Sequence, residues 1–499
     1  MVPLGDLFNR SFHERASKPA LEYRDARGAL RVLTFGDVDV RAARMAQELA
    51  ARGVGHGDRL CVHLANRIEF LDLYLACTRL GAILVPMNVM YRERELRHVI
   101  ADSEPLAVVT SGDSDVAYPS GRPLWDVDAL SLAAVDRREA VAPAARVSGE
   151  DPALIIYTSG TTGTAKGAVL SHDNLAANGV TLATAWQISD HDRYLAALPL
   201  FHVHGLGNGV HCWLIAGCTM RLVERFDHRT AAGEFLDFRP TLFFGVPTIY
   251  VRLLDTKVVT PDQARGIGTG ARLFVSGSAP LPSHVHAAFR ARFGHTILER
   301  YGMSEALMIM SNPYDGERRA GTVGPPLDHV SARIAGEGGE ILGDDEVGEV
   351  EIRSASLFAG YWRRPDATAA AFHDGWFRTG DLAVRSSDGY YTLRGRRGDL
   401  IISGGFNIYP REIEETLVED SRVLEAAVVG VPDELRGEIP IAYIVAEDSV
   451  DTDVIEAVCR SKLASFKIPR AFIRVDALPR TALGKVQKHL LPPWSGAAK

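Results

Sequence analysis

Residues 157–167 read Tyr-Thr-Ser-Gly-Thr-Thr-Gly-Thr-Ala-Lys-Gly and directly follow the apolar run Ala153–Ile156, which suits a buried strand. The segment holds three glycines, one lysine and five Ser or Thr side chains. Such a loop can turn its backbone N–H groups inward as an anion-binding nest, to which the hydroxyls add donors. Gly160 and Gly163 permit positive φ and a close approach of the backbone, and Lys166 supplies a positive charge. The stretch therefore predicts a strand of an α/β sheet followed by a loop that binds a polyphosphate.

The loop differs from that of the common nucleoside triphosphatases. Their pattern places Lys and then Ser or Thr directly after the second glycine. Here two residues separate Gly163 from Lys166, and Gly167 follows the lysine, so the magnesium-binding hydroxyl of that pattern has no counterpart. The alternative is a polar surface turn. Such turns are common, but a run this dense in glycine and hydroxyls after a strand favours the anion nest.

The size and charge of the chain restrict its architecture and its partners. At 499 residues it exceeds what one hydrophobic core usually supports, so at least two domains are expected. The formal net charge of −8 argues against nucleic acid as the main partner, because binding to the phosphate backbone needs a basic face. A local basic pocket is still compatible with this charge.

The cysteines and the apolar segments predict a cytoplasmic protein. The five cysteines are scattered, and no spacing among them resembles a zinc site or a disulfide framework, which favours a reducing compartment. We expect no signal peptide, because the first ten residues lack a basic segment followed by an apolar one. We also expect no membrane span, because no window reaches about 18 apolar residues.

The order of the predicted elements indicates an α/β large domain and a small α+β domain. Short strands and helices alternate over residues 33–109 and again over 174–301, as in a largely parallel sheet. Residues 111–148 are rich in Ser, Asp, Pro and Ala and are expected to form a surface excursion. From Val347 a period-two pattern predicts an antiparallel, barrel-like region. A charged, glycine-bearing segment near 395–399 then predicts a linker, which divides the chain into domains 1–397 and 398–499.

Seven further stretches decide what the glycine-rich loop serves. They are Leu198-Pro-Leu-Phe-His202-Val-His204-Gly205, Gly277-Ser278-Ala279-Pro280-Leu281, Glu299-Arg300-Tyr301-Gly302-Met303-Ser304-Glu305, Thr379-Gly380-Asp381-Leu382, Gly395-Arg396, Ser403-Gly404-Gly405-Phe406-Asn407-Ile408-Tyr409-Pro410 and Pro479-Arg480-Thr481-Ala482-Leu483-Gly484-Lys485. In this order and spacing they resemble the core motifs of the acyl-adenylate-forming superfamily, which includes acyl-CoA synthetases. The resemblance runs from about residue 30 to 490, nearly the whole chain.

This resemblance implies a large α/β domain of stacked sheets with a small mobile C-terminal domain, and an ATP-dependent ligase that joins an acid to a thiol. The acid attacks the α-phosphorus of ATP, pyrophosphate leaves, and the thiol of coenzyme A then takes the acyl group from acyl-AMP. The implied cofactors are ATP, Mg²⁺ and CoA. The implied partners are a small carboxylic acid and CoA, with a carrier protein as an alternative thiol donor.

The resemblance also assigns roles to residues. Lys485 is the implied adenylation lysine, Glu305 the implied Mg²⁺ ligand with Thr158 beside it, and Ser304 the contact to the α-phosphate. Tyr301 would stack on adenine, and Asp381 with Arg396 would bind the ribose. The β- and γ-phosphates would contact Thr158, Ser159, Gly160, Thr161, Thr162, Gly163 and Lys166. The nucleotide would further contact Gly277, Ser278, Ala279, Glu299, Gly302 and Met303.

Single residues in these motifs also have ordinary structural interpretations. Tyr301 alone is more often a core aromatic, Asp381 a turn residue and Lys485 a solvated surface lysine. Only the motif context reverses these priors. His202 and His204 lack a third metal ligand at ordinary spacing, so we expect no zinc, and the resemblance places His202 near the acyl group.

The positions of the motifs predict a moving small domain. Lys485 lies in the small domain and the glycine-rich loop in the large one, so adenylation needs the two closed on each other, and the thiol step needs a rotation about a hinge. The resemblance implies that Gly404 and Gly405 then face the acyl-AMP. The hinge position, usually Asp or Lys, is Gly398 here.

The identity of the acid is the harder question. Glu299–Met303 and the following segment 311–316 most resemble malonyl-CoA synthetases, in which arginines at the positions of Arg252 and Arg300 are expected to bind the distal carboxylate. A buried second carboxylate requires a paired cation, which Arg can bind bidentately. Ile309 departs from the polar residue expected there and leaves methylmalonate, another short branched acid or a longer fatty acid open. A stand-alone adenylation enzyme and a non-catalytic nucleotide sensor are further alternatives.

Overall fold

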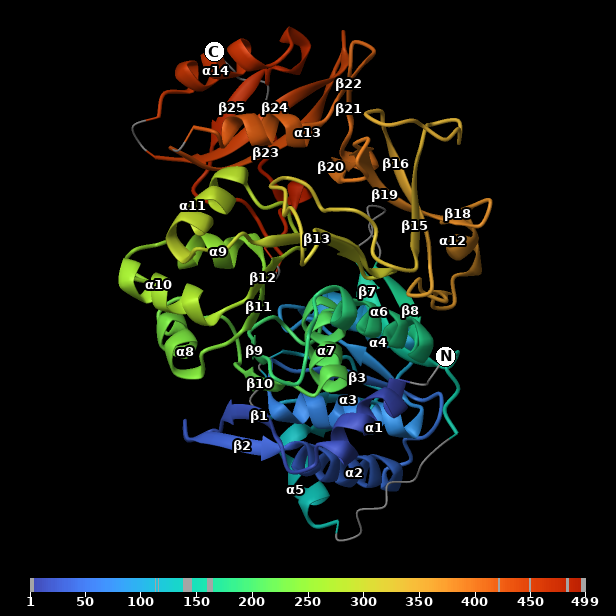
Figure 1. Cartoon of the computed structure of the whole chain (residues 1–499). Helices are drawn as coiled ribbons and strands as arrows, with labels where there is room; N and C mark the ends of the chain where they lie inside the picture. Colours follow the sequence, from blue (N-terminus) through green and yellow to red (C-terminus); the bar gives the residue numbers. More distant parts are fainter. Residues whose placement is uncertain are drawn as a thin grey trace.

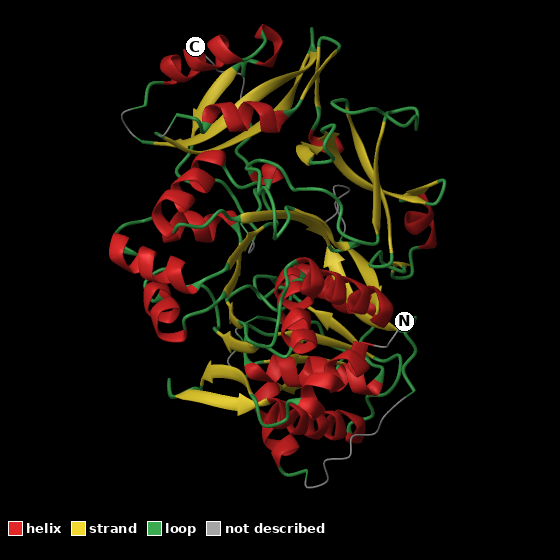
Figure 2. Cartoon of the chain, in the orientation of Figure 1, coloured by secondary structure: helices red, strands yellow, loops and turns green. Residues whose placement is uncertain are grey.

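The computed structural model describes residues 4–494 except 113, 115, 138–145, 159–164, 421, 448–449 and 482–483. The large domain contains two sheets with helices between and around them, and a smaller antiparallel sheet lies beside them (Figures 1 and 2). The C-terminal segment forms a separate sheet with its own helices at one end of the molecule (Figure 1). The predicted architecture, a large α/β domain with a barrel-like region and a small α+β domain, is confirmed.

The first sheet has seven strands in the order β17-β8-β7-β4-β3-β5-β6, of which β7, β4, β3, β5 and β6 are parallel. Its strands are β3 (Arg59–His63), β4 (Ile83–Pro86), β5 (Ala107–Thr110), β6 (Leu124–Asp126), β7 (Pro152–Thr158), β8 (Lys166–Ser171) and β17 (Gly360–Tyr361). β7 and β8 pair in antiparallel fashion, so the glycine-rich segment connects a hairpin.

The second sheet has eight strands in the order β14-β13-β12-β11-β9-β10-β1-β2, with a parallel centre and an antiparallel strand at each edge. Its strands are β1 (Pro19–Arg24), β2 (Leu30–Thr34), β9 (Arg193–Ala196), β10 (Thr219–Leu222), β11 (Leu242–Gly245), β12 (Leu273–Ser276), β13 (Leu298–Met303) and β14 (Leu307–Ser311). The chain therefore passes β1 and β2 to this sheet before it builds the first one.

Helices fill the space between the sheets and cover their outer faces (Figure 2). They are α1 (Leu4–Glu14), α2 (Phe35–Ala51), α3 (Ile68–Leu80), α4 (Glu93–Ser103), α5 (Val127–Val135), α6 (His172–Ala185), the π-helix η1 (His204–Val210), α7 (His211–Ala216), α8 (Ala231–Phe238), α9 (Pro247–Leu253), α10 (Pro261–Gly270) and α11 (Ser283–Phe293). Within the described ranges, no helix combines the length and apolarity needed to cross a membrane.

Local sequence signals set several helix ends. Thr34 caps α2 by accepting from the backbone N–H of Asp37, whose carboxylate accepts from the backbone N–H of Thr34. Ser171 caps α6 in the same way with Asn174. α3 ends at Gly81 in the left-handed conformation with φ of 66°, where glycine avoids the strain of a side chain. These capping interactions fix where α2 and α6 begin and where α3 ends.

The remaining strands form two antiparallel units. The barrel-like region contains β15 (Val330–Ala335), β16 (Val347–Ser354), β18 (Phe372–His373), β19 (Trp376–Arg385) and β20 (Tyr391–Arg396), with α12 (Pro365–Ala370). The C-terminal unit contains β21 (Ile401–Ser403), β22 (Phe406–Ile408), β23 (Val423–Asp433), β24 (Gly437–Ala446) and β25 (Ala471–Arg474), with α13 (Pro410–Leu417) and α14 (Thr452–Lys462). The short 3₁₀ segments are η2 (Arg397–Asp399), η3 (Ser465–Lys467) and η4 (Lys488–Leu490).

One sequence prediction of the fold is wrong. The segment 111–148 was expected to be a surface excursion, but it contains β6 and α5, and β6 pairs with β5 in parallel as an edge strand. The strand is only Leu124–Asp126, so its pattern was too short to detect. Asp126 caps α5 by accepting from the backbone N–H of Ala129.

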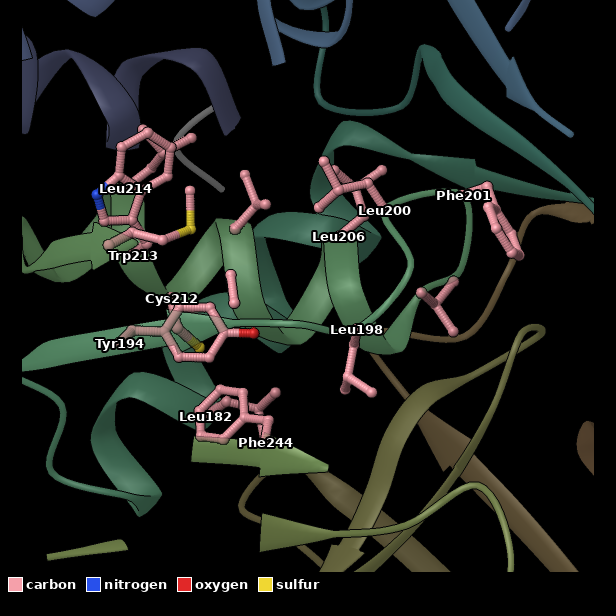
Figure 3. Close-up of a cluster of buried hydrophobic side chains, with 14 of the residues drawn as sticks. Leu182, Tyr194, Leu198, Leu200, Phe201, Leu206, Cys212, Trp213, Leu214 and Phe244 are labelled. Atoms are coloured by element: carbon pink, nitrogen blue, oxygen red, sulfur yellow. The ribbon is translucent and has the colours of Figure 1, made fainter. Parts of the chain in front are cut away.

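The core between the sheets surrounds η1 and α7. Figure 3 shows Leu206, Cys212, Trp213 and Leu214 of these helices beside Tyr194 of β9 and other buried residues. Trp213 is fully buried, and its Nε1 donates to Ala20 O at 3.0 Å, which ties α7 to β1. Burial of each such side chain contributes roughly 1.5–3 kcal/mol to the free energy of folding. These contacts therefore hold α7 and the preceding η1 against the second sheet.

Candidate active site

The ends of the β7–β8 hairpin meet the glutamate predicted to bind metal. Thr158 and Lys166 pair across the hairpin, and Thr158 Oγ1 donates to Glu305 Oε1 at 3.4 Å. Glu305 is buried and also accepts from the Tyr361 hydroxyl at 3.1 Å. Lys166 Nζ lies 5.0 Å from the centre of the Tyr361 ring. The predicted phosphate contacts Ser159, Gly160, Thr161, Thr162 and Gly163 lie outside the described residues.

The oxygen atoms around Glu305 fit a magnesium ion. The carboxylate of Glu305 and the hydroxyl of Thr158 are hard oxygen donors, which Mg²⁺ prefers, and it usually keeps several waters and phosphate oxygens as further ligands. Among the described residues there is no group of three or more His, Cys, Asp or Glu that could hold a metal. A single carboxylate is therefore consistent with an ion that arrives with a polyphosphate.

A second cluster joins Tyr301, Asp381 and Arg396. The Tyr301 hydroxyl donates to Asp381 Oδ2 at 2.5 Å, and Arg396 Nε lies 2.8 Å from Asp381 Oδ1. Burial raises the pKa of Asp381, whereas Arg396, the Tyr301 hydrogen bond and Lys485 lower it. β13, β19 and β20 bring these three side chains together, although they are far apart in sequence.

Lys485 lies in a turn that faces the large domain. Thr481 N donates to Lys485 O at 2.8 Å, and Gly484 N donates to Thr481 O at 2.8 Å, which closes the turn. A Cβ on Gly484 would lie 3.2 Å from Thr248 Oγ1 of α9, so the turn touches the large domain there. Desolvation and Arg396 lower the pKa of Lys485, and the carboxylates of Asp381 and Glu305 raise it. The turn therefore brings Lys485 within electrostatic reach of both clusters.

The segment after β12 approaches a buried arginine. Ser278, between Gly277 and Ala279, has φ of 70°, a strained conformation for a serine and one that is common at functional sites. A Cβ on Gly277 would lie 2.4 Å from Arg300 Cζ, so the guanidinium packs directly on the glycine. Arg300 is 4% exposed, and burial lowers its pKa to about 9. It therefore remains a cation at neutral pH.

The two histidines of the Phe-His-Val-His motif lie near Arg300. His204 Nδ1 is 3.2 Å from Ser278 Oγ, and His204 N donates to His202 Nδ1 at 3.1 Å. Burial and the neighbouring Arg300 lower the pKa of His202 to about 3 and hold that of His204 well below its usual range. Both rings are therefore neutral, and Arg300 carries the positive charge of this group.

The two arginines predicted to bind a distal carboxylate are not brought together. Arg252 is exposed and lines a cavity of about 300 Å³ that also contains Arg225, His228 and Thr248. Tyr250, also on α9, is buried on the side of Arg300, and its hydroxyl donates to Val275 O at 2.6 Å. α9 therefore presents Arg252 to a different environment from that of Arg300.

Several predicted contact residues have mainly structural partners in this arrangement. Glu299 is buried, and its Oε1 accepts from Gly321 N at 3.0 Å. Gly302 packs against Leu307 O and Met308, and Met303 O accepts from Ala306 N at 3.2 Å in the turn that carries the half-buried Ser304. Gly404 and Gly405 form the exposed tip of the β21–β22 hairpin, with φ of 58° and 82°.

Sequence reasoning missed three residues of these clusters. Tyr361 contacts both Lys166 and Glu305, and burial together with the Glu305 carboxylate raises its pKa, so the phenol keeps its proton. Asn208 of η1 and Ser276 at the end of β12 are almost fully buried, and their side-chain polar atoms have no partner in the described protein. A tyrosine in a short edge strand, an asparagine between glycines and a serine at a strand end carry no distinctive local pattern.

Comparisons with known proteins identify the family. The model of the AMP-binding enzyme family matches residues 8–362, and that of the AMP-binding enzyme C-terminal domain matches residues 412–485. A sulfoacetate–CoA ligase of Cupriavidus necator is 38% identical over 471 residues, which cover 91% of each chain. A malonate–CoA ligase of Arabidopsis thaliana is 34% identical, covering 87% of this chain and 78% of that protein.

A solved structure agrees with these relatives. The crystal structure of ATP-bound MatB from Rhodopseudomonas palustris superimposes with a TM-score of 0.90 at 39% identity and covers 98% of both chains. The implied use of ATP and CoA is thereby confirmed. The chain belongs to the AMP-binding enzyme family and is an AMP-forming acyl-CoA synthetase.

Proposed function

We propose that this enzyme activates a short acid that carries a second anionic group, with malonate or methylmalonate as the leading candidates. The observation that carries the proposal is the state of Arg300, which is 4% exposed while its Nε and NH2 atoms have no hydrogen-bond partner in the described protein. A buried cation is costly unless an anion pairs with it. A distal carboxylate accepts two parallel hydrogen bonds from a guanidinium and supplies that anion.

The relatives support an acid of this size and charge. Sulfoacetate and malonate, the substrates named for two similar ligases, are both acetates that carry a second anionic group on the α-carbon. The neutral state of His202 and His204 fits such an acid. The single positive charge of Arg300 then balances the single negative charge of the distal group. Sulfoacetate is therefore the second candidate.

The side chains on the nucleotide side suit the first half-reaction. Two anions approach each other when the carboxylate attacks the α-phosphorus, so positive charge at that point lowers the barrier. We assign Lys485 to this position, Lys166 with the loop 158–163 to the departing pyrophosphate, and Ser304 to the α-phosphate. The Tyr301 ring and residues 277–279, 299 and 302–303 would enclose adenine. The Asp381 carboxylate would accept hydrogen bonds from the ribose hydroxyls, with Arg396 beside it.

Glu305 and Thr158 would hold Mg²⁺, which neutralises phosphate charge when bound. The Tyr361 hydroxyl orients the Glu305 carboxylate. The contact with the Tyr361 ring would hold the Lys166 ammonium near the phosphates that the magnesium ion neutralises. Glu305 thus links the glycine-rich loop to β13–β14 and aligns the phosphates with the acid.

The second half-reaction needs a rearrangement of the small domain. We propose domains 1–397 and 398–499, with the hinge at Gly398 in η2. Rotation would withdraw the Lys485 turn from Thr248 and bring Gly404 and Gly405 toward the acyl-AMP, where the thiol of CoA enters. We also propose a cytoplasmic location, which suits five free cysteines that are all buried.

The acid is tested by ATP–pyrophosphate exchange with malonate, methylmalonate, sulfoacetate, acetate, octanoate and palmitate. The proposal expects exchange with the dianionic acids at much higher kcat/KM than with acetate. Exchange with octanoate and none with a dianionic acid would refute it in favour of a fatty acyl-CoA synthetase. Acyl transfer to a carrier phosphopantetheine and not to CoA would favour the carrier-loading alternative.

Two arginine variants separate the candidate partners of the second anion. Arg300→Met should lower kcat/KM for malonate at least roughly 30-fold, because it removes one partner of a buried charge pair. Arg252→Met is the matched control, since Arg252 is exposed and lines the cavity of about 300 Å³ and does not pack on Gly277 as Arg300 does. A selective loss in Arg252→Met with none in Arg300→Met would move the site to that cavity.

A further inference from the structure

Among the buried polar atoms without a partner in the described protein, several belong to Arg300, to the end of the neighbouring strand β12 and to η1. They are Nε and NH2 of Arg300, Nε2 of His204, both amide atoms of Asn208 and Oγ of Ser276. Asn208 is 0% exposed and Ser276 and His204 are 1% exposed. Proteins rarely leave buried donors and acceptors unpaired, and exceptions concentrate where a ligand supplies the partner. Asn208 has no role in the mechanism described so far.

The glycines of η1 show how this helix is oriented. A Cβ at Gly205 would lie 2.2 Å from Pro199 O, and one at Gly209 would lie 2.5 Å from the Tyr194 hydroxyl, so this side of η1 faces the end of β9. Tyr194 points its hydroxyl toward the helix in Figure 3. A Cβ at Gly207 would meet the Leu307 side chain at 3.5 Å, so the opposite side faces β14.

Asn208 lies between these two sides and faces the strands that carry Ser276 and Arg300. In a π-helix, whose hydrogen bonds join residues five apart, residues four apart share nearly the same face, so Asn208 lies beside His204. His204 contacts Ser278, which follows β12. The second sheet has the order β14-β13-β12-β11-β9, so β12 and β13 lie between the strands that the two glycine sides of η1 face. A side chain that points between those two sides therefore points toward β12 and β13. Their ends hold Ser276 and Arg300.

We propose that Asn208 is a specificity-determining residue whose side-chain amide hydrogen bonds the distal anionic group of the acid. This inference rests on the proposed function. The two unpartnered Arg300 donors, Nε and NH2, lie on one edge of the guanidinium and reach two oxygens of the anion. A carboxylate keeps further lone pairs, and a sulfonate adds a third oxygen, so both need a donor from another direction. Asn208 supplies that donor, and the ligand class is an acetate with a second oxyanion on the α-carbon.

Two pairs of acids with matched shape test the proposal by ATP–pyrophosphate exchange. Malonate is paired with 3-methylbutanoate, in which an isopropyl group replaces the distal carboxylate. Sulfoacetate is paired with 3,3-dimethylbutanoate, in which a tertiary butyl group replaces the sulfonate. Asn208→Leu should lower kcat/KM for the dianionic acids roughly 10- to 100-fold. It should leave unchanged or raise kcat/KM for the two acids whose distal group is uncharged. The dianionic acid with the higher wild-type kcat/KM identifies the second anion as carboxylate or sulfonate.

Asn178 provides a matched control. It is also a buried asparagine, but its Nδ2 donates to Met308 O at 2.9 Å and its Oδ1 accepts from Met308 N at 3.4 Å. Asn178→Leu should lower the Tm and affect all four acids alike. Asn208→Leu should leave the Tm unchanged or raise it, because it removes an unpaired polar group. Asn208→Asp keeps the size of the side chain and should abolish only the dianionic activities by repulsion.

The outcomes separate this inference from the proposed function. An equal loss of all four acids in Asn208→Leu and Asn208→Asp, or no change in either variant, would overturn the role of Asn208 while the wild-type preference for dianionic acids stands. A wild-type enzyme that prefers, in each pair, the acid with the uncharged distal group would instead overturn the proposed function itself.

Discussion

At the scale of the residue, Glu299 illustrates how burial changes a group that its motif alone describes as polar. It lies in β13 at 6% exposure, accepts from Gly321 N and lies near Arg411 of α13, across the boundary with the C-terminal unit. Burial raises its pKa to about 7, and the Gly321 hydrogen bond and Arg411 only partly offset this. The carboxyl therefore titrates near neutral pH in the folded protein.

Replacement of Glu299 with Gln should change the pH dependence of stability. Because the folded-state pKa is raised from 4.5 to about 7, protonated Glu299 stabilises the fold below pH 4.5, and this contribution is lost as the pH rises to about 7. The full effect is on the order of 3 kcal/mol. The difference in Tm between Glu299→Gln and the wild type should therefore grow in favour of the variant from pH 5 to pH 8. A constant difference would contradict the raised pKa.

Lys485 is the residue on which the adenylation step depends in the proposed mechanism. Lys485→Ala should lower ATP–pyrophosphate exchange roughly 10²- to 10³-fold, the usual effect of removing one group that stabilises transition-state charge. Lys462→Ala is the control, because Lys462 pairs with Glu419 on the surface of the C-terminal unit. Unchanged exchange in Lys485→Ala would remove the lysine from the mechanism.

At the scale of the element, the segment that carries Thr481, Gly484 and Lys485 joins two parts of the molecule. Gly484 has φ of 77° and approaches Thr248 of α9, so the turn needs glycine for its backbone and for the contact. The isolated bridge between Arg480 and Val486 closes its base. The turn thus presents Lys485 at a defined place over the large domain.

Gly484→Ala should weaken this docking more than it weakens the fold. The variant adds backbone strain of about 1–2 kcal/mol and a contact of 3.2 Å with Thr248. Gly389→Ala is the matched control, because Gly389 lies in a hairpin with φ of 87° and nothing within 4 Å of its Cβ position. Both should lower Tm similarly, but only Gly484→Ala should lower pyrophosphate exchange. Equal exchange in both variants would show that the contact with Thr248 is irrelevant.

At the scale of the whole molecule, the two domains adopt an arrangement that suits the first half-reaction. Lys485 is within electrostatic reach of Asp381 and Glu305, whereas the tip Gly404–Gly405 is exposed. The chain passes between the domains in η2, directly after β20 delivers Arg396 to Asp381. A rotation at this point would exchange the two elements over the large domain without disturbing either core.

Gly398→Pro should separate the half-reactions, because proline restricts φ to near −65° and removes the freedom of the hinge. Pyrophosphate exchange should persist, since φ in a 3₁₀ segment is close to that of proline, and CoA-dependent formation of acyl-CoA should fall at least roughly tenfold. Single-turnover assays that start from acyl-AMP measure the second step alone. A variant that forms acyl-CoA at the wild-type rate would place the hinge elsewhere.

Several features of the fold and the site follow from local pattern. The strand–helix alternation, the antiparallel change after Val347 and the motif order all predicted their elements. The short β6 did not, because three residues carry too little periodicity and its pairing with β5 is a non-local contact. The clustering of Tyr301, Asp381 and Arg396 was implied by resemblance and not by spacing, since β13 belongs to the second sheet and β19 and β20 to the barrel-like region, and the two units meet only in the folded protein.

The residues of the glycine-rich loop by themselves predicted an anion-binding nest, and the resemblance of the ordered motifs to the acyl-adenylate-forming superfamily implied the ligase chemistry. Only the tertiary structure decided which arginine is buried. Both Arg252 and Arg300 were expected to bind the distal carboxylate, yet α9 exposes one of them and β13 buries the other against Gly277. The same holds for Asn208, whose environment depends on how η1 seats against the ends of β9, β12 and β14. Burial and partnering are sums over non-local contacts, and no local pattern records them.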